Sequence, residues 1–396
     1  MIFKRRMLRA FLYVTITVVI LLTSVSIYFL TQRNKTVVLP KPTGSFAVGR
    51  TNYDWIDASR NESFTETDGN KRKLSVWVWY PSDFKENTKK AEYLPGKWET
   101  EQEKNTGMAY LQQNFKKVQT NSYQDVPLST KQTNYPLIVF EPGMGKIVFN
   151  YTILAENLAS EGYIVVAINP TYSSDFVVFS DGGTANKTSK GSMPEGDATD
   201  KELNDVGSNL IKTWSADMSF VISKLGEMSI EQGNMWTGHV DMEHIGAFGH
   251  SFGGAASVEA SITDERIKTN IDIDGYLYGV QTRPEKPSMF IMSQHEQKGI
   301  DLQENNKIQN FYNSLNKDGY IIEISKTAHF SFTDNTLFFS PILKALGIYG
   351  TINGERGLQI TNSYITAFFD KYLKNMDSNL LEQKQSFYPE VKLQLK

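Results

Sequence analysis

The feature that most constrains the fold is the turn sequence Gly249-His250-Ser251-Phe252-Gly253-Gly254, which stands between an apolar strand and a helix of small residues. A Gly-x-Ser-x-Gly motif alone recurs by chance. Its strand–turn–helix setting is the one in which a tight turn lifts a serine hydroxyl above the edge of a sheet. Such a strained turn is tolerated where close neighbours lack side chains, and Gly249, Gly253 and Gly254 provide that room. We therefore predict that Ser251 is a nucleophile.

Strands and helices alternate along most of the chain, which predicts an α/β protein with a mostly parallel central sheet and helices on both faces. Together with the turn at Ser251, this pattern indicates the α/β-hydrolase fold. The predicted strands are 46–57, 73–80, 135–141, 163–169, 244–249, 267–274, 287–294 and 320–325. The predicted helices are 151–160, 201–228, 252–263, 305–317 and 362–373. Residues 82–134 are expected to be irregular or locally helical. The polar segment 171–200 is expected to be a long loop with a functional or mobile role.

The amino terminus differs in kind from the rest of the chain. Four basic residues within positions 1–9 precede the uncharged stretch 10–30. At about 1.5 Å per residue, that stretch spans the roughly 30 Å hydrocarbon core of a bilayer. The positive-inside rule then predicts a cytoplasmic basic segment, a transmembrane anchor and a catalytic domain outside the cytoplasm. The alternative is a signal peptide cleaved near Ser24-Val25-Ser26, which would release a secreted protein.

After the apolar stretch, residues 31–45 are predicted to be a linker, and residues 46–396 one catalytic domain. Composition excludes several kinds of partner and site. A net charge of −3 argues against a nucleic-acid partner, because no basic domain is available to neutralise phosphates. The absence of cysteine excludes a cysteine nucleophile, a thiolate metal site and disulfides. We predict neither a metal nor another cofactor.

A serine hydroxyl needs a base to take its proton. The histidines of the chain are His239, His244, His250, His295 and His329. In the predicted fold the base follows the nucleophile along the chain. His329 lies on a loop after the last predicted strand and is our choice, with His295 as the alternative. His250 is expected to support the turn, and the two earlier histidines to be surface or structural residues.

An acid must hold the base in the correct tautomer. Asp274 ends the strand that follows the helix after Ser251, and we predict that it is this acid. Asp272, on the same face of the strand by its period of two, and Glu296, after the next strand, remain alternatives.

The oxyanion of an acyl-transfer reaction needs two backbone N–H donors. One is predicted to be Phe252, the residue after the nucleophile. The other should follow the strand 135–141, where Pro142-Gly143-Met144-Gly145 forms a glycine-containing turn. We predict that Met144 is the second donor.

Several segments resemble the plasma and intracellular type II platelet-activating factor acetylhydrolases. They are Gly249 to Ala255, Ile271 to Tyr276, Ala328 to Asp334, Val48-Gly49-Arg50, Val78 to Pro81, Glu92 to Pro95, Gly143-Met144-Gly145 and Leu158 to Tyr163. The resemblance covers roughly residues 46 to 375. It places Ser251, Asp274 and His329 at the family's triad positions, and Met144 and Phe252 at its oxyanion donors.

The resemblance implies a calcium-independent serine esterase that removes short or oxidised acyl chains from the sn-2 position of glycerophospholipids. The substrate would then be a lipid or another small ester, with the membrane as partner through the amino-terminal helix. Glu141-Pro142 replaces the family's common Ser-His, and Gly275-Tyr276 departs from it after the acid. Alternatives are a cutinase-like or dienelactone-type carboxylesterase, and a membrane-tethered binding module without activity.

Overall fold

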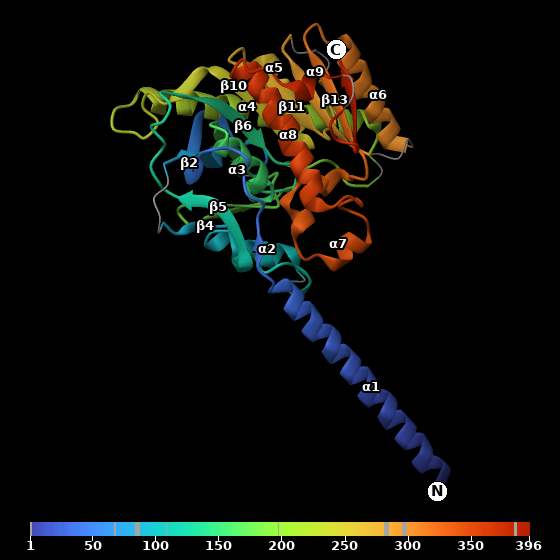
Figure 1. Cartoon of the computed structure of the whole chain (residues 1–396). Helices are drawn as coiled ribbons and strands as arrows, with labels where there is room; N and C mark the ends of the chain where they lie inside the picture. Colours follow the sequence, from blue (N-terminus) through green and yellow to red (C-terminus); the bar gives the residue numbers. More distant parts are fainter. Residues whose placement is uncertain are drawn as a thin grey trace.

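A computed structural model describes residues 2–66, 69–83, 88–107, 109–196, 198–280, 285–294, 299–383 and 386–396. A single large sheet forms the frame of these residues (Figure 1). In spatial order its strands are β1 (Val37–Val38), β5 (Val118–Gln124), β2 (Ala47–Asn61), β3 (Lys71–Ser82), β7 (Ile164–Asn169), β6 (Tyr135–Glu141), β10 (Val240–His250), β11 (Ile267–Ile273), β12 (Ser288–Ser293), β13 (Gly319–Ile324) and β14 (Val391–Leu395), and β4 (Lys90–Glu92) pairs with β5.

The centre of this sheet is parallel, as the sequence predicted. The neighbours from β7 through β6, β10, β11 and β12 to β13 all run parallel. Antiparallel pairs occur toward both ends, between β2 and β3, between β3 and β7, and between β13 and β14. Because the parallel strands share one direction, their carboxyl ends meet at one edge, which is where ligands bind in such sheets.

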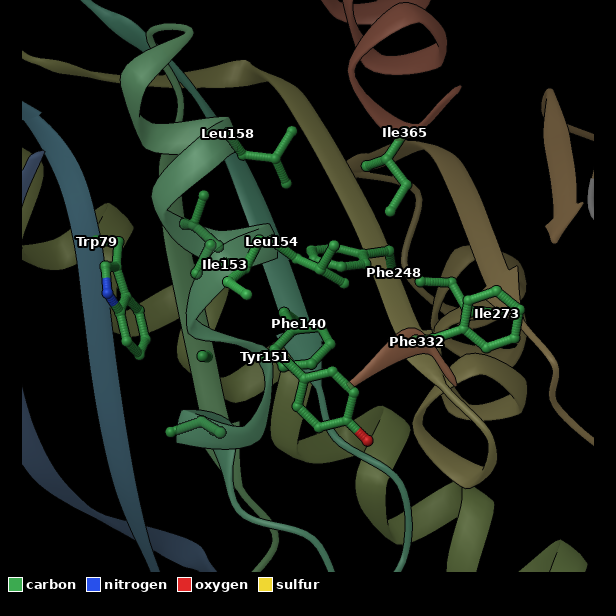
Figure 2. Packing of buried hydrophobic residues seen from close by; sticks show 14 of the residues in the cluster. Trp79, Phe140, Tyr151, Ile153, Leu154, Leu158, Phe248, Ile273, Phe332 and Ile365 are labelled. Carbon is green, nitrogen blue, oxygen red and sulfur yellow. The ribbon is translucent and has the colours of Figure 1, made fainter. Parts of the chain in front are cut away.

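Helices cover both faces of the sheet, which confirms the α/β-hydrolase prediction. The helices on one face are α3 (Thr152–Ser160) and α8 (Gly354–Leu373), and those on the other are α4 (Asp200–Ile230), α5 (Phe252–Thr263) and α6 (Gly299–Ser314). Strand β6 shows the division, because Ile138 and Phe140 join the first apolar cluster while Leu137 and Val139 join the second. Figure 2 shows part of the first cluster, in which Phe140 and Phe248 pack beneath Leu154 of α3.

The remaining elements are short. They are α2 (Lys97–Thr106), α7 (Pro341–Ala345), α9 (Asn379–Glu382), the hairpin strands β8 (Phe176–Val178) and β9 (Thr184–Asn186), and the 3₁₀ turns η1 (Ala109–Leu111), η2 (Phe115–Lys117), η3 (Val148–Tyr151), η4 (His329–Phe332) and η5 (Asp334–Leu337). The predicted loop 171–200 therefore contains a hairpin, and the segment 82–134 contributes α2, β4 and β5 to the fold.

Helix α1 (Ile2–Arg33) projects away from the rest of the molecule (Figure 1). By length and composition it is able to cross a membrane, a property that a signal sequence shares. Its carboxyl-terminal end is attached to the domain. The Gln113 side chain donates to the backbone oxygens of Arg33 and Lys35, at 3.0 and 2.9 Å, and the rings of Phe29 and Phe339 lie 6.0 Å apart.

The segment 31–45, predicted to be a linker, packs on the catalytic domain. It contributes β1, which pairs with β5, and Leu39 is buried. The backbone N–H of Gly44 donates to the Ser160 hydroxyl at 3.0 Å. The chain between α1 and β2 is therefore held at several points along its length.

Candidate active site

Ser251 lies in the turn between β10 and α5, at the carboxyl end of the central parallel strands. Its backbone has φ 55° and ψ −119°, a left-handed conformation that is unfavourable for a residue with a side chain. The Ser251 N–H donates to the Ile273 oxygen at 2.7 Å, which ties the turn to β11. The side chain is half-buried, so the turn leaves it within reach of a ligand.

The glycines around Ser251 are required by close packing. A Cβ on Gly249 would come within 2.2 Å of the backbone of Gly253, and one on Gly253 within 2.2 Å of the Glu141 oxygen. A Cβ on Gly254 would come within 2.0 Å of a carboxyl oxygen of Asp272. None of the three has a positive φ. The backbone strain is therefore at Ser251, and the close packing is at the three glycines around it.

The structure brings His329 and Asp274 together. His329 follows β13 at the start of η4, and its Nδ1 lies 2.7 Å from the Asp274 carboxylate. Because a carboxylate only accepts, Nδ1–H is the donor and Nε2 is left free of a proton in the neutral ring. Asp274 also accepts from the backbone N–H and hydroxyl of Ser293, at 2.7 and 2.9 Å, and is fully buried.

The alternatives to this pair lie elsewhere. Asp272 is on β11, where its carboxylate faces Gly254 and Gly275. His295 and Glu296 lie outside the described residues. His239 approaches the Thr133 oxygen at 2.7 Å, and His244 pairs with Asp241 at 2.8 Å, both at partly exposed positions away from Ser251 in the sheet.

Two backbone N–H groups, one in the turn after β6 and one at the start of α5, lack a hydrogen-bond acceptor among the described residues. In the turn after β6, Gly143 donates to the Tyr151 hydroxyl, Gly145 to the Ser173 oxygen and Lys146 to the Gly143 oxygen. Among the described residues, the N–H of Met144 has no such partner. Phe252 is the first residue of α5, where a backbone N–H has no acceptor within the helix.

The sequence model of the family "Platelet-activating factor acetylhydrolase, isoform II" matches residues 31–189 and 227–387, most of the chain. The chain belongs to this family. A platelet-activating factor acetylhydrolase of Cavia porcellus is 25% identical over 86% of this chain and 79% of its own length. An Arthroderma benhamiae protein named "Probable 1-alkyl-2-acetylglycerophosphocholine esterase" is 24% identical over 65% of each chain.

A solved structure gives the same fold for this acetylhydrolase-family chain. A ferulic acid esterase from Streptomyces cinnamoneus superimposes with a TM-score of 0.73 at 24% identity, over 90% of this chain and 98% of its own. Membership of the acetylhydrolase family and the curated relatives make this protein an ester hydrolase of the α/β-hydrolase kind.

A buried network in this acetylhydrolase-family protein joins the turn after β6 to the His329 loop. His250 Nε2 lies 2.8 Å from the His329 backbone oxygen, and His250 Nδ1 lies 2.8 Å from the Tyr151 hydroxyl. A carbonyl only accepts, so Nε2 carries the proton, and the Tyr151 hydroxyl donates to Nδ1. That hydroxyl accepts in turn from Gly143 N–H at 3.1 Å. Every group in this chain of hydrogen bonds is satisfied.

Burial fixes the charge state of this network. It lowers the pKa of His250 to about 3, with the nearby imidazole of His329 acting in the same direction. Burial likewise raises the pKa of the Tyr151 hydroxyl above its ordinary value. Both side chains are therefore neutral at ordinary pH. The sequence predicted that His250 supports the turn, but it gave no signal for Tyr151, which lies ninety-nine positions away.

Glu141 is one of the residues at which the sequence was noted to depart from the family it resembles. It ends β6, and its side chain is fully buried on the face of the sheet covered by α4 and α5. No hydrogen-bond partner reaches either carboxyl oxygen from the described residues. Burial, and next the charge of Asp217, raise the pKa of Glu141 well above its ordinary value. Among the described residues no group of three or more potential metal ligands is found.

Proposed function

We propose that this protein is a serine esterase that removes short acyl groups, with the sn-2 acyl group of platelet-activating-factor-like or oxidised phospholipids as its substrate. The observation that carries the proposal is the 2.7 Å contact between His329 and Asp274, with Ser251 in a strained turn at the same edge of the sheet. The names of the curated relatives support the phospholipid substrate.

In the proposed mechanism, Ser251 attacks the ester carbonyl while His329 Nε2 takes the hydroxyl proton. Asp274 holds the ring in the required tautomer and stabilises the imidazolium that forms. The carbonyl oxygen becomes an oxyanion that accepts from the N–H groups of Met144 and Phe252. The tetrahedral intermediate collapses, His329 gives its proton to the leaving alcohol, and an acyl-enzyme remains.

Water then repeats the same steps on the acyl-enzyme. His329 removes a proton from the water as it attacks, and a second oxyanion forms between the same two donors. Collapse of this intermediate releases the carboxylic acid and returns the proton to Ser251.

We further propose that residues 10–30 anchor the protein in a membrane, with residues 1–9 in the cytoplasm and the catalytic domain outside. The basic cluster before the apolar stretch supports this orientation. A single-pass anchor would hold the active site near a lipid substrate. If the amino-terminal segment is cleaved instead, the catalytic domain is secreted.

The test is replacement of Ser251 by Ala. We expect kcat/KM on 4-nitrophenyl acetate to fall by roughly four or more orders of magnitude, because the nucleophile is lost. A fluorophosphonate probe should label the wild type at Ser251 and leave the variant unlabelled. Full activity in Ser251→Ala would exclude the mechanism. Absence of both turnover and labelling in the wild type would favour the binding module instead.

The matched control is Ser261→Ala. Ser261 is a buried serine near the carboxyl-terminal end of α5, and its hydroxyl donates to the Val258 oxygen at 2.7 Å. Its loss should lower stability without abolishing labelling. Equal loss of labelling in both variants would mean that the effect of Ser251→Ala is structural.

A further inference from the structure

Lys146 places a cation beside the proposed catalytic residues. It follows Met144 by two positions in the turn after β6, and its side chain is half-buried. Its Nζ lies 4.5 Å from the ring centroid of Phe330, the residue after His329. In the part of the chain that the structure describes, no carboxylate forms an ion pair with this ammonium group. Burial lowers the pKa of Lys146, so an anionic ligand at this position would stabilise its charged form.

The charges around Lys146 leave an excess of one positive charge. The acid that acts on Lys146 electrostatically is Asp175, whose carboxylate forms an ion pair with Lys187 at 3.2 Å. Two ammonium groups and one carboxylate therefore give a net charge of plus one. Asp175 forms its ion pair with Lys187 and acts on Lys146 without pairing with it, so Lys146 is the cation that has no ion pair of its own among the described residues.

Two adjoining cavities meet at Lys146. The smaller one, about 60 Å³, is bordered by amide side chains: Gln102, Asn105, Asn150 and Asn335. The larger one, about 380 Å³, has an apolar wall: Leu111, Phe115, Phe338, Phe339, Ile342 and Leu343. Both cavities are lined by Gln102, Asn105, Lys146, Asp175 and Asn335. A cation among amides suits an anionic group, and the apolar wall suits an alkyl chain.

We propose that Lys146 binds an anionic group of the ester substrate while the larger cavity holds the adjoining alkyl part. The proposal rests on the proposed esterase function of Ser251 and defines its substrate class as anionic amphiphilic esters. The anion is a phosphate or a carboxylate. A glycerophospholipid carries the first in its headgroup, and an oxidised acyl chain carries the second at its end.

The first test measures binding without turnover. Octyl phosphate, decanoate and 1-octanol are titrated calorimetrically into the wild type, Lys146→Arg and Lys146→Met. We expect Lys146→Met to weaken binding of the favoured anion roughly tenfold to a hundredfold, and Lys146→Arg to retain it, because the charge carries the contact. Octanol should bind the wild type more weakly than that anion. Equal affinities for the anions and octanol, or equal binding to all three proteins, would overturn the proposal.

The second test measures the substrate preference. One pair is 1-alkyl-2-acetylglycerophosphocholine and the matching diglyceride without phosphate, and the other is mono-4-nitrophenyl glutarate and 4-nitrophenyl pentanoate. We expect Lys146→Met to lower the ratio of kcat/KM, anionic over neutral, roughly tenfold in one pair. The pair that responds identifies phosphate or carboxylate. An unchanged ratio in both pairs would overturn the anion site and leave the esterase intact.

The control is Lys224→Met. Lys224 is a lysine of α4 whose ammonium pairs with Glu227 at 2.7 Å, and it borders neither cavity. Its replacement should leave both the anion affinities and the kcat/KM ratios unchanged. A loss equal to that in Lys146→Met would show that total protein charge, rather than Lys146, determines the preference.

Discussion

At the scale of single residues, His250 is the side chain that connects the parts of the site. It joins the loop of His329 to the turn that carries Met144, through Tyr151 and Gly143. All of these contacts require a neutral imidazole with its proton on Nε2, since a second ring proton would face the donating Tyr151 hydroxyl. Protonation of His250 would therefore break the hydrogen bond that the Tyr151 hydroxyl donates to it, at a cost to the folded state.

This requirement predicts a dependence of stability on pH. The pKa of His250 is about 3 in the folded protein, against 6.5 ordinarily. Between these values the unfolded chain binds a proton that the folded chain does not, so stability falls as pH falls through this window. From pH 7 to pH 5 we expect the free energy of unfolding of the wild type to drop by about 2 kcal/mol more than that of His250→Gln. Urea denaturation at the two pH values measures this, and parallel drops would contradict it.

At the scale of elements, the turn at Ser251 is a contact between β6, β10 and α5 with no room for a methyl group. Gly253 is the point at which α5 meets backbone, because a Cβ there would lie 2.2 Å from the Glu141 oxygen and 2.5 Å from the Pro142 oxygen. Both oxygens belong to the backbone at the end of β6. Relief of such a clash must move α5 relative to the turn that carries Met144.

We accordingly predict that Gly253→Ala lowers both stability and activity. Overpacking should lower the free energy of unfolding by about 3 kcal/mol, and the shift of the oxyanion turn should lower kcat/KM about a hundredfold. Calorimetry and a nitrophenyl ester assay measure the two effects.

Gly226→Ala in α4 is the matched control for that substitution. A Cβ there meets only the flexible tip of Met242, at 3.2 Å. Alanine should therefore be neutral or stabilise the helix by about 0.5 kcal/mol. If Gly226→Ala lowered the free energy of unfolding as much as Gly253→Ala, the turn at Ser251 would not be specially crowded.

At the scale of the whole molecule, the main feature is that α1 projects from the domain and is attached to it near its carboxyl-terminal end (Figure 1). The carboxyl-terminal end of α1 contacts Gln113 and Phe339, which come from two distant segments and both line the larger cavity beside Lys146. If α1 spans a bilayer, this cavity lies on the side of the domain that faces the lipid.

Deletion of residues 2–26 tests the importance of the anchor. The remaining chain keeps Phe29 and Arg33 and their contacts with the domain. We expect hydrolysis of water-soluble 4-nitrophenyl acetate to be unchanged and hydrolysis of short-chain phospholipid in vesicles to fall roughly tenfold or more, because co-localisation with the lipid is lost. Equal rates on vesicles for both proteins would argue against an anchoring role.

The parallel centre of the fold was predictable because each of its strands is buried on both faces and therefore reads as an apolar run. The strand β5 was missed because its inward residues, such as Thr120 and Ser122, are polar although buried. Helix α8 begins at Gly354, eight positions before the predicted start, because the Asn353 side chain caps it by accepting from Arg356 N–H.

At the site, chain order favoured His329 and the end of a strand favoured Asp274, and the structure joins these two residues. No comparable pattern in the sequence predicted which distant segments contact one another around the site. Tyr151 resembles any aromatic residue at the start of a helix, and only the folded chain sets it against His250. Lys146 reads as a surface lysine until the cavities on either side of it are seen.

The groups proposed to act on the ester come from four separate strand ends, after β6, β10, β11 and β13, between Met144 and His329. The proposed site is therefore complete only when all four strand ends are in place. Contacts between residues so far apart in sequence form slowly, since loop closure must precede them. During refolding, esterase activity should therefore recover later than secondary structure. The recovery of activity would mark the step at which β13, which precedes His329, pairs with β12.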